Sequence, residues 1–225
     1  MDHTVHLNLV TTEGLVNPME PHPSRKMKLE RRAALFKAAT HEFTQLGFEQ
    51  ASLNRIIGKV GMSKSSFYHY FTNKTELFQQ IIEQTLEPLS KIGSAIEPET
   101  LTKDTFWPAI LASTKGVNLM TQDNPEVFEV GRMFHRNLHQ PNGLCEDMMT
   151  GPIALVTRVL EHGKVIGTIR DDLPSSLLLS SVMALGMAMD RWALDNIESL
   201  PAEEFAAFPE KAVKMFIRVL APDED

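Results

Sequence analysis

The 225-residue sequence predicts an all-α fold. From Lys28 onward, apolar residues recur every three or four positions, which is the period of an amphipathic helix. Proline, glycine and asparagine gather in the breaks between these stretches, where they end helices and allow the chain to turn. After residue 20, no pair of alternating stretches indicates a strand hairpin. At about 150 residues per domain, the length predicts one or two domains.

A first helix is predicted from Lys28 to Leu46, followed by Gly47, because glycine commonly ends helices. Its periodicity places Leu29 and Phe43 on the face expected to be buried.

Three polar residues are expected to cap the next helices. Ser52, Ser63 and Asn73 have side-chain oxygens that accept hydrogen bonds from the first turn of a helix. Glu76 follows Asn73 at the spacing of a capping box. The helices expected from these caps are 53–60, 64–71 and 73–89. Gly61 permits a tight turn between the first two, which indicates a helix-turn-helix.

The rest of the chain predicts five further helices. Their expected bounds are Asp104–Met120, Pro125–His139, Leu144–His162, Pro174–Ile197 and Ala202–Leu220. The longest uncharged run, 173–189, is shorter than the roughly 20 residues that span a bilayer. We therefore expect a buried helix there and no membrane partner.

Charge divides the chain. Residues 24–80 carry a net charge of +6, whereas residues 1–23 carry −3 and residues 81–225 carry −10. A basic segment on an acidic body indicates an anionic partner such as nucleic acid, and an unevenly charged solvent surface is the alternative. The expected organisation is a flexible N-terminal extension over 1–23, a helix-turn-helix domain over 24–72 and a helical domain over 73–225.

The sequence offers little for other function classes. Cys145 is the single cysteine, which excludes an intrachain disulfide and a Cys-cluster metal site. His135 and His139 have the i, i+4 spacing of metal ligands, but no third ligand accompanies them. We find no phosphate-binding glycine loop and no catalytic constellation, so neither a metal, a cofactor nor an enzyme is expected. The N-terminus lacks the pattern of a signal peptide, which predicts a cytoplasmic location.

The stretch from Ser52 to Phe71 carries the functional signal. Ile56, Val60 and Met62 can form a small core with Phe67 between the two short helices. The residues then left to project outward are Lys64, Ser65, Ser66, Tyr68, His69 and Tyr70. Hydroxyls, an amine, an imidazole and phenols are groups that reach DNA phosphates and base edges.

This segment resembles the TetR family of transcriptional regulators from about Lys28 to Phe78. The motifs that carry the resemblance are Phe43-Thr-Gln-Leu-Gly-Phe48, Val60-Gly-Met-Ser-Lys64, Phe67-Tyr-His-Tyr-Phe71 and Asn73-Lys74. The resemblance implies a homodimer in which each subunit has a three-helix DNA-binding domain and a helical body for effector binding and dimerisation.

The resemblance also implies residue roles. Lys64, Ser65 and Ser66 stand where family members meet bases, and the positions that usually meet phosphates are Ser52, Tyr68, His69 and Lys74. Two residues depart from the family pattern. Arg55 stands where an acid is usual, so it either contacts DNA or points into solvent. Ile57 stands where a small residue is usual, and it could change the spacing of the two short helices.

The body is expected to bind a small, mostly apolar effector and to dimerise. We expect the effector between the 73–89 helix and the helices spanning 104–162, with Trp107, Arg132 and His135 in its lining. The last two helices are expected to form the dimer, because 177–189 is apolar on more than one face. The protein expected is a repressor of a pseudo-palindromic operator. A DNA-binding regulator without a small-molecule effector and an all-helical enzyme are the alternatives.

Overall fold

The computed structural model describes residues 22–138, 144–196 and 198–223. Within these ranges the chain forms α-helices and two short 3-10 helices and no strand, which confirms the all-α prediction. The N-terminal elements are η1 (Pro23–Lys26), α1 (Leu29–Gln50), α2 (Leu53–Lys59), α3 (Lys64–Tyr68) and α4 (Lys74–Ser94). The C-terminal elements are η2 (Pro98–Thr100), α5 (Phe106–Asp123), α6 (Glu126–Asn137), α7 (Glu146–Val165), α8 (Ser175–Asn196) and α9 (Ala202–Leu220).

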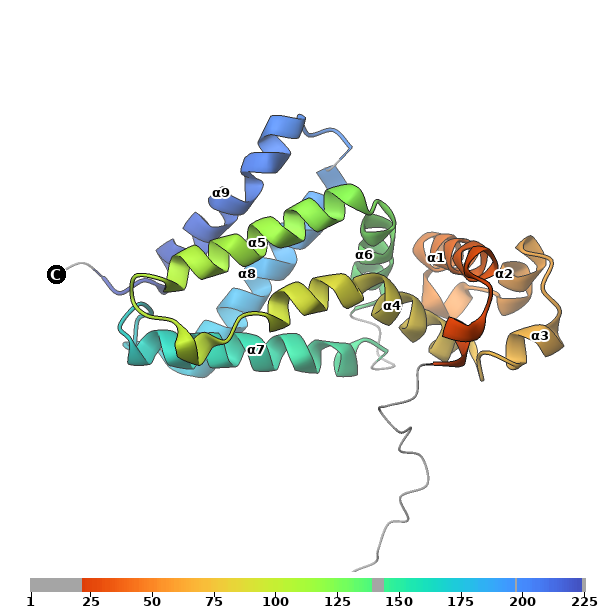
Figure 1. Ribbon diagram of the computed structural model, residues 1–225, viewed down its shortest axis with the longest axis horizontal. Helices are drawn as coiled ribbons and strands as arrows, with labels where there is room; N and C mark the ends of the chain where they lie inside the picture. Colours follow the sequence, from red (N-terminus) through yellow and green to blue (C-terminus); the bar gives the residue numbers. More distant parts are fainter. Residues whose placement is uncertain (1–21, 139–143, 197, 224–225) are drawn as a thin grey trace, which may run out of the picture.

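The helix-turn-helix lies at one end of an elongated molecule (Figure 1). α1, α2 and α3 form this end, and α4 runs from it into the body beside α5. α6 stands between the two parts and packs against α1 on one side and against α4 and α8 on the other. The helix-turn-helix is therefore joined to the body by α4 through the chain and by α6 through packing.

The three predicted caps are confirmed. Each side-chain oxygen accepts a hydrogen bond from the backbone N–H three residues later, at 3.4 Å for Ser52, 3.1 Å for Ser63 and 2.8 Å for Asn73. The capping box at α4 differs from the expected one, since the Glu76 carboxylate reaches back to the backbone N–H and hydroxyl of Thr72. These bonds satisfy N–H groups that have no partner inside a helix.

The predicted buried face of α1 is partly wrong. Phe43 is fully buried together with Leu35, but Leu29 is 71% exposed. α1 also continues past Gly47 to Gln50, with a kink at the glycine, whose φ of 75° and ψ of 164° are not helical. Glycine adopts this backbone conformation readily because it has no Cβ.

α4 is longer than predicted, because it continues through Pro88 to Ser94. Proline removes one hydrogen bond and clashes with the preceding turn, so the continuation depends on packing against α5 and α6. The other predicted bounds differ from the structure by a few residues or agree with it. The expected helix ends at His139 and Ile197 lie outside the described residues, as do residues 1–21 of the expected extension.

Two apolar clusters form the core. The first joins α1–α4 to α6, with Phe43, Phe67, Phe78 and Met133 among its buried members. It therefore crosses the domain boundary expected at 72/73. The second lies in the body and consists of Phe106, Leu160, Ile169, Leu178 and Leu220 with their partly buried neighbours.

α8 is apolar but poorly covered. Among the described residues it is the one helix with the length and mean hydropathy of a membrane span, and only 6% of its apolar window is buried within the chain. The expectation of a buried helix is therefore wrong for the isolated chain, in which Leu178 is its one buried residue. The same helix packs against α6, α7 and α9, so its uncovered side is a single face.

Candidate nucleic-acid interface

α3 presents one polar face to solvent. Lys64, Ser65 and His69 are exposed, and Tyr68 is 55% exposed. On its opposite face Phe67 is fully buried, where its ring stacks on that of Phe71 with centroids 5.3 Å apart. The short helix is thus anchored by its aromatic side and leaves its polar side free to meet a partner.

The core beneath α3 contains the predicted residues. Ile56, Met62 and Phe67 are buried, and Val60 is partly buried against them. Ile57 is also buried, at 4% exposure, so this departure from the family pattern is accommodated inside the core.

Ser66 and Tyr70 are only half-exposed. The Tyr70 ring packs against the core, and its edge meets the His69 ring at a centroid distance of 4.7 Å. The structure therefore presents Lys64, Ser65, Tyr68 and His69 more fully than these two.

Arg55 is held by an acid from another helix. Its Nε donates a hydrogen bond of 2.6 Å to Oε1 of Glu42 in α1, and its Nη2 donates to the Gln50 carbonyl at 3.2 Å. The same Glu42 oxygen accepts from the backbone N–H of Ser52 at 3.2 Å. In a capping box an acid three residues after the cap makes this second bond, so here Glu42 supplies it from α1. The two expected alternatives for Arg55 both omitted this ion pair.

Glu42 is the functional residue that the sequence reasoning missed. Its side chain is 5% exposed and lies 3.6 Å from Nζ of Lys59. Burial alone would raise its pKa, but the Arg55 and Ser52 hydrogen bonds and the charges of Arg55 and Lys59 together lower the pKa below its ordinary value. A carboxylate on the buried face of α1 was the available signal, because buried charges are normally paired.

Lys74 caps the end of α1 instead of pointing outward. Its ammonium donates to the carbonyls of Phe48 at 2.6 Å, Ala51 at 3.0 Å and Glu49 at 3.3 Å, and it lies 4.4 Å from the Phe48 ring centroid. Burial lowers the pKa of this ammonium, and the nearby Glu49 charge opposes the shift. An ammonium has three N–H donors, and these three carbonyl oxygens are within hydrogen-bond distance of it. In this conformation Lys74 is therefore not available for the phosphate contact expected of it.

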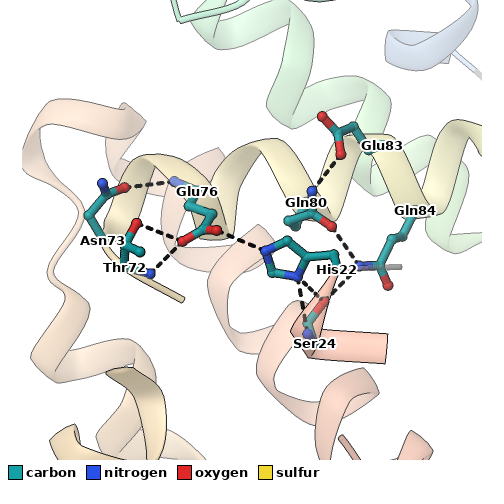
Figure 2. A network of polar contacts seen from close by, with 8 residues as sticks. All are labelled: His22, Ser24, Thr72, Asn73, Glu76, Gln80, Glu83 and Gln84. Carbon is teal, nitrogen blue, oxygen red and sulfur yellow. Dashed lines mark hydrogen bonds and ion pairs between the residues drawn. The ribbon is translucent and has the colours of Figure 1, made fainter. Parts of the chain in front are cut away.

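A polar network fastens the segment before α1 to α4 (Figure 2). His22 donates from Nε2 to the Glu76 carboxylate at 2.9 Å, while its Nδ1 accepts the Ser24 backbone N–H at 3.1 Å. The Ser24 hydroxyl in turn accepts from Nε2 of Gln84 at 2.8 Å. The His22 ring also lies against Phe71, with centroids 5.5 Å apart, so the network braces the end of the recognition segment.

The three residues expected to line an effector site do not come together. Trp107 is in the first turn of α5, at the end remote from α6 (Figure 1). The Arg132 guanidinium donates to the Leu194 carbonyl at 2.8 Å and pairs with Glu129, so it is occupied at the end of α8. α5 has 18 residues and rises about 1.5 Å per residue, so its length lies between Trp107 in its first turn and Arg132 and His135 in α6.

The described residues of the body include two grooves lined mostly by apolar side chains. The first, of about 500 Å³, lies between α5 and α9 and is lined by Trp107, Leu111, Val213 and Ile217 with Lys115 and Lys214. The second, of about 400 Å³, lies between α8 and α9 and is lined by Met189, Trp192, Phe208 and Met215 with their neighbours. Neither groove lies between α4 and α5–α7, where the effector was expected.

Other chemistry finds little support in the described residues. Within them no group of three or more His, Cys, Asp or Glu side chains could hold a metal ion. His139 of the expected histidine pair lies outside them. Cys145 is buried, and burial raises the pKa of its thiol to about 11, which disfavours the reactive thiolate.

Known proteins resemble part of the chain in sequence. Residues 35–81 match the family described as bacterial regulatory proteins, tetR family. The HTH-type transcriptional regulator YhgD of Bacillus subtilis is 30% identical over 113 residues, which are 48% of this chain and 58% of YhgD. The nucleoid occlusion factor SlmA of Mannheimia succiniciproducens is 30% identical over 96 residues, which are 39% of this chain and 44% of SlmA. The matches thus span about half the length of these relatives.

Solved structures share the fold of nearly the whole chain. SmeT, the repressor of the Stenotrophomonas maltophilia multidrug efflux pump SmeDEF, superimposes with a TM-score of 0.64 at 16% identity, over 85% of this chain and 90% of SmeT. The regulator FadR of Bacillus subtilis, solved with stearoyl-CoA, gives a TM-score of 0.64 at 14% identity, over 82% of this chain and 97% of FadR. At these identities the likeness concerns the fold alone.

Proposed function

The chain belongs to the TetR family of DNA-binding transcriptional regulators, and we propose that it is a homodimeric repressor that leaves its operator when a small, mostly apolar molecule binds. The observation that carries the DNA-binding part is the exposed polar face of α3. The residues we propose for operator contacts are Lys64, Ser65, Tyr68 and His69, with Ser66 and Tyr70 at the edge of the face. We assign the protein to the cytoplasm, where the DNA of a bacterial cell lies.

Arg55 and Lys74 have different proposed roles. Arg55 is half-exposed, so its guanidinium can remain paired with Glu42 while a phosphate approaches its outer edge. Lys74 positions the end of α1, and Ser52 contributes mainly as the cap of α2. We therefore propose an indirect role in DNA binding for Lys74 and Ser52.

The proposed dimer uses the uncovered apolar face of α8 and α9. Trp192 and Met215 are each 46% exposed there, and both line the groove between the two helices. Side chains of a second copy can enter this groove, and the symmetric packing of α8 and α9 gives a four-helix interface. A dimer places two α3 helices for two half-sites about 34–36 Å apart or a multiple of that distance.

The proposed effector and the proposed repressor role are supported by solved structures that share the fold. SmeT is described as a repressor and has been solved with triclosan, and FadR has been solved with stearoyl-CoA. Both ligands have a large apolar part. The groove beside Trp107 offers an apolar floor, and its lining also contains Lys214 and the Lys115–Glu210 ion pair. We therefore propose it as the first place to look for an apolar effector whose acidic group meets Lys214.

The test begins with a duplex selected from a random-sequence pool by the protein itself. Lys64→Ala should weaken binding of that duplex about tenfold or more, because a charge-assisted contact is lost from each subunit. Lys103→Ala is the matched control, since Lys103 is an exposed lysine in the loop before α5. Failure of the protein to enrich any duplex would contradict DNA binding, and equal effects of the two substitutions would contradict the assigned face.

The alternative regulator without a small-molecule effector differs in one result. If no apolar acid changes the affinity for the selected duplex, the effector part of the proposal is wrong while the DNA-binding part stands. If an apolar acid does lower that affinity, Trp107→Ala should weaken the response and leave DNA binding without the acid unchanged. We propose no enzymatic activity and no cofactor.

A further inference from the structure

The kink in α1 leaves a backbone group that the body satisfies. The ψ of 164° at Gly47 rotates the following peptide out of the helical orientation, so the Phe48 N–H turns away from the helix axis. Phe48 is buried, and a buried N–H without a partner is costly. Its partner is Oδ1 of Asn137 in α6, at 2.8 Å.

Asn137 is rigidly held for this contact. Its side chain is fully buried, and its Nδ2 donates to the Met133 carbonyl one turn earlier in α6, at 2.7 Å. This bond fixes the carboxamide orientation, so the oxygen faces α1. The contact lies in the mostly apolar cluster shared by α1, α4 and α6. Apolar side chains tolerate sliding, whereas a buried hydrogen bond is satisfied at one register only.

The same helix is fastened to α8 less than two turns earlier. Arg132 donates from Nη1 to the Leu194 carbonyl at 2.8 Å. Gly131 allows α8 to approach closely, because a Cβ there would lie 3.0 Å from a Leu194 methyl carbon. From Arg132 to Asn137 is about 7.5 Å along the helix axis. A short rigid segment of α6 therefore joins the proposed dimer helix to the helix-turn-helix.

We propose that Asn137 is a positioning residue for operator binding, which fixes the orientation of each helix-turn-helix relative to the dimer by holding the Phe48 N–H at the α1 kink. The inference rests on the proposed function as a dimeric DNA-binding regulator. Asn137 is not part of the DNA-binding surface. Its substitution should therefore alter how the two recognition helices are spaced and not how one of them meets DNA.

The experiment compares two duplexes. One is the palindromic duplex selected by the wild-type protein, and the other carries only one of its half-sites. Asn137→Ala should lower the affinity for the two-half-site duplex about tenfold and leave the affinity for the single half-site within about twofold. Asn124→Ala is the matched control, because the Asn124 Nδ2 also donates to a carbonyl four residues earlier, at 2.7 Å, but at the end of α5. It should bind both duplexes as the wild type does.

Three results would overturn the proposal. The first is unchanged affinity of Asn137→Ala for the two-half-site duplex. The second is an equal loss of affinity for both duplexes, which would assign Asn137 to the stability of the helix-turn-helix. Failure of the wild-type protein to select any duplex would overturn the proposed function as well. This result differs from the first two, which overturn only the role of Asn137. Should Asn137→Ala not fold, amide exchange in the wild-type protein decides: slow exchange at Phe48 supports the contact, and exchange as fast as at an exposed amide refutes it.

Discussion

Replacing Glu42 with alanine removes the acid that holds α2 to α1. The substitution deletes the acceptor for Arg55 and for the Ser52 N–H and the charge near Lys59. Hydrogen bonds to charged groups contribute about 1.5–3 kcal/mol, but Arg55 is 54% exposed and regains water when it is released. We therefore expect a loss of about 2–3 kcal/mol of unfolding free energy. For a chain of this size that corresponds to a fall in Tm of about 5–10 °C.

Thermal unfolding followed by circular dichroism measures the effect. Glu30→Ala is the control, because Glu30 is an exposed acid in the first turn of the same helix and should cost less than about 1 kcal/mol through the helix dipole. The double variant with Arg55→Ala should lose less than the sum of the single variants, by about 1 kcal/mol, because each removes the same ion pair. Additive losses, or a Glu42→Ala variant as stable as Glu30→Ala, would refute the reasoning.

Three further predictions follow from the described contacts. Gly47→Ala should destabilise the protein by about 1–3 kcal/mol in chemical denaturation, because a φ of 75° with a ψ of 164° is strained for any residue with a Cβ. The control Gly58→Ala, in the last turn of α2 where an added Cβ would meet no atom within 4 Å, should be neutral or stabilising, and equal effects of the two substitutions would contradict the kink. Trp192→Arg should shift the dimer toward monomer in sedimentation at micromolar concentration, and a wild-type monomer there would exclude the dimer face. Burial raises the pKa of Glu76, but hydrogen bonds from Thr72 and His22 outweigh burial and lower the pKa below the ordinary 4.5. The stabilisation from Glu76 is therefore complete above about pH 4.5 and is lost as the pH falls through the lowered pKa. Glu76→Gln should flatten the acid branch of a curve of stability against pH, and an unchanged branch would contradict the network.

Local signals in the sequence predicted the helix-turn-helix well. The caps at Ser52, Ser63 and Asn73 depend on residues within one turn of each other, whereas the burial of Phe67 follows from the apolar spacing that links it to the short helix before it. Such contacts follow from residue type and spacing. The outward position of Lys64 follows from the same pattern, once the buried positions are assigned.

Contacts between distant segments could not be predicted in this way. Glu42 meets Arg55 across 13 positions, and Lys74 reaches carbonyls more than 20 positions away. Trp107, Arg132 and His135 were predicted to line one site from two different predicted helices, and helix periodicity does not say which neighbouring helix each face meets. The position of α6 between α1 and α8 decides which helix each face of α6 meets, and that position is set by tertiary packing.

The salt dependence of DNA affinity tests whether this protein binds DNA through its basic helix-turn-helix. Because contacts between cations and phosphates are expected to dominate binding, log K should fall linearly with log salt concentration, with a slope of about −0.9 for each phosphate neutralised. If a dimer makes only about four such contacts, raising the salt concentration from 50 to 200 mM should weaken binding of the selected duplex about 150-fold. An affinity that stays flat over this range would contradict DNA binding through contacts between cations and phosphates.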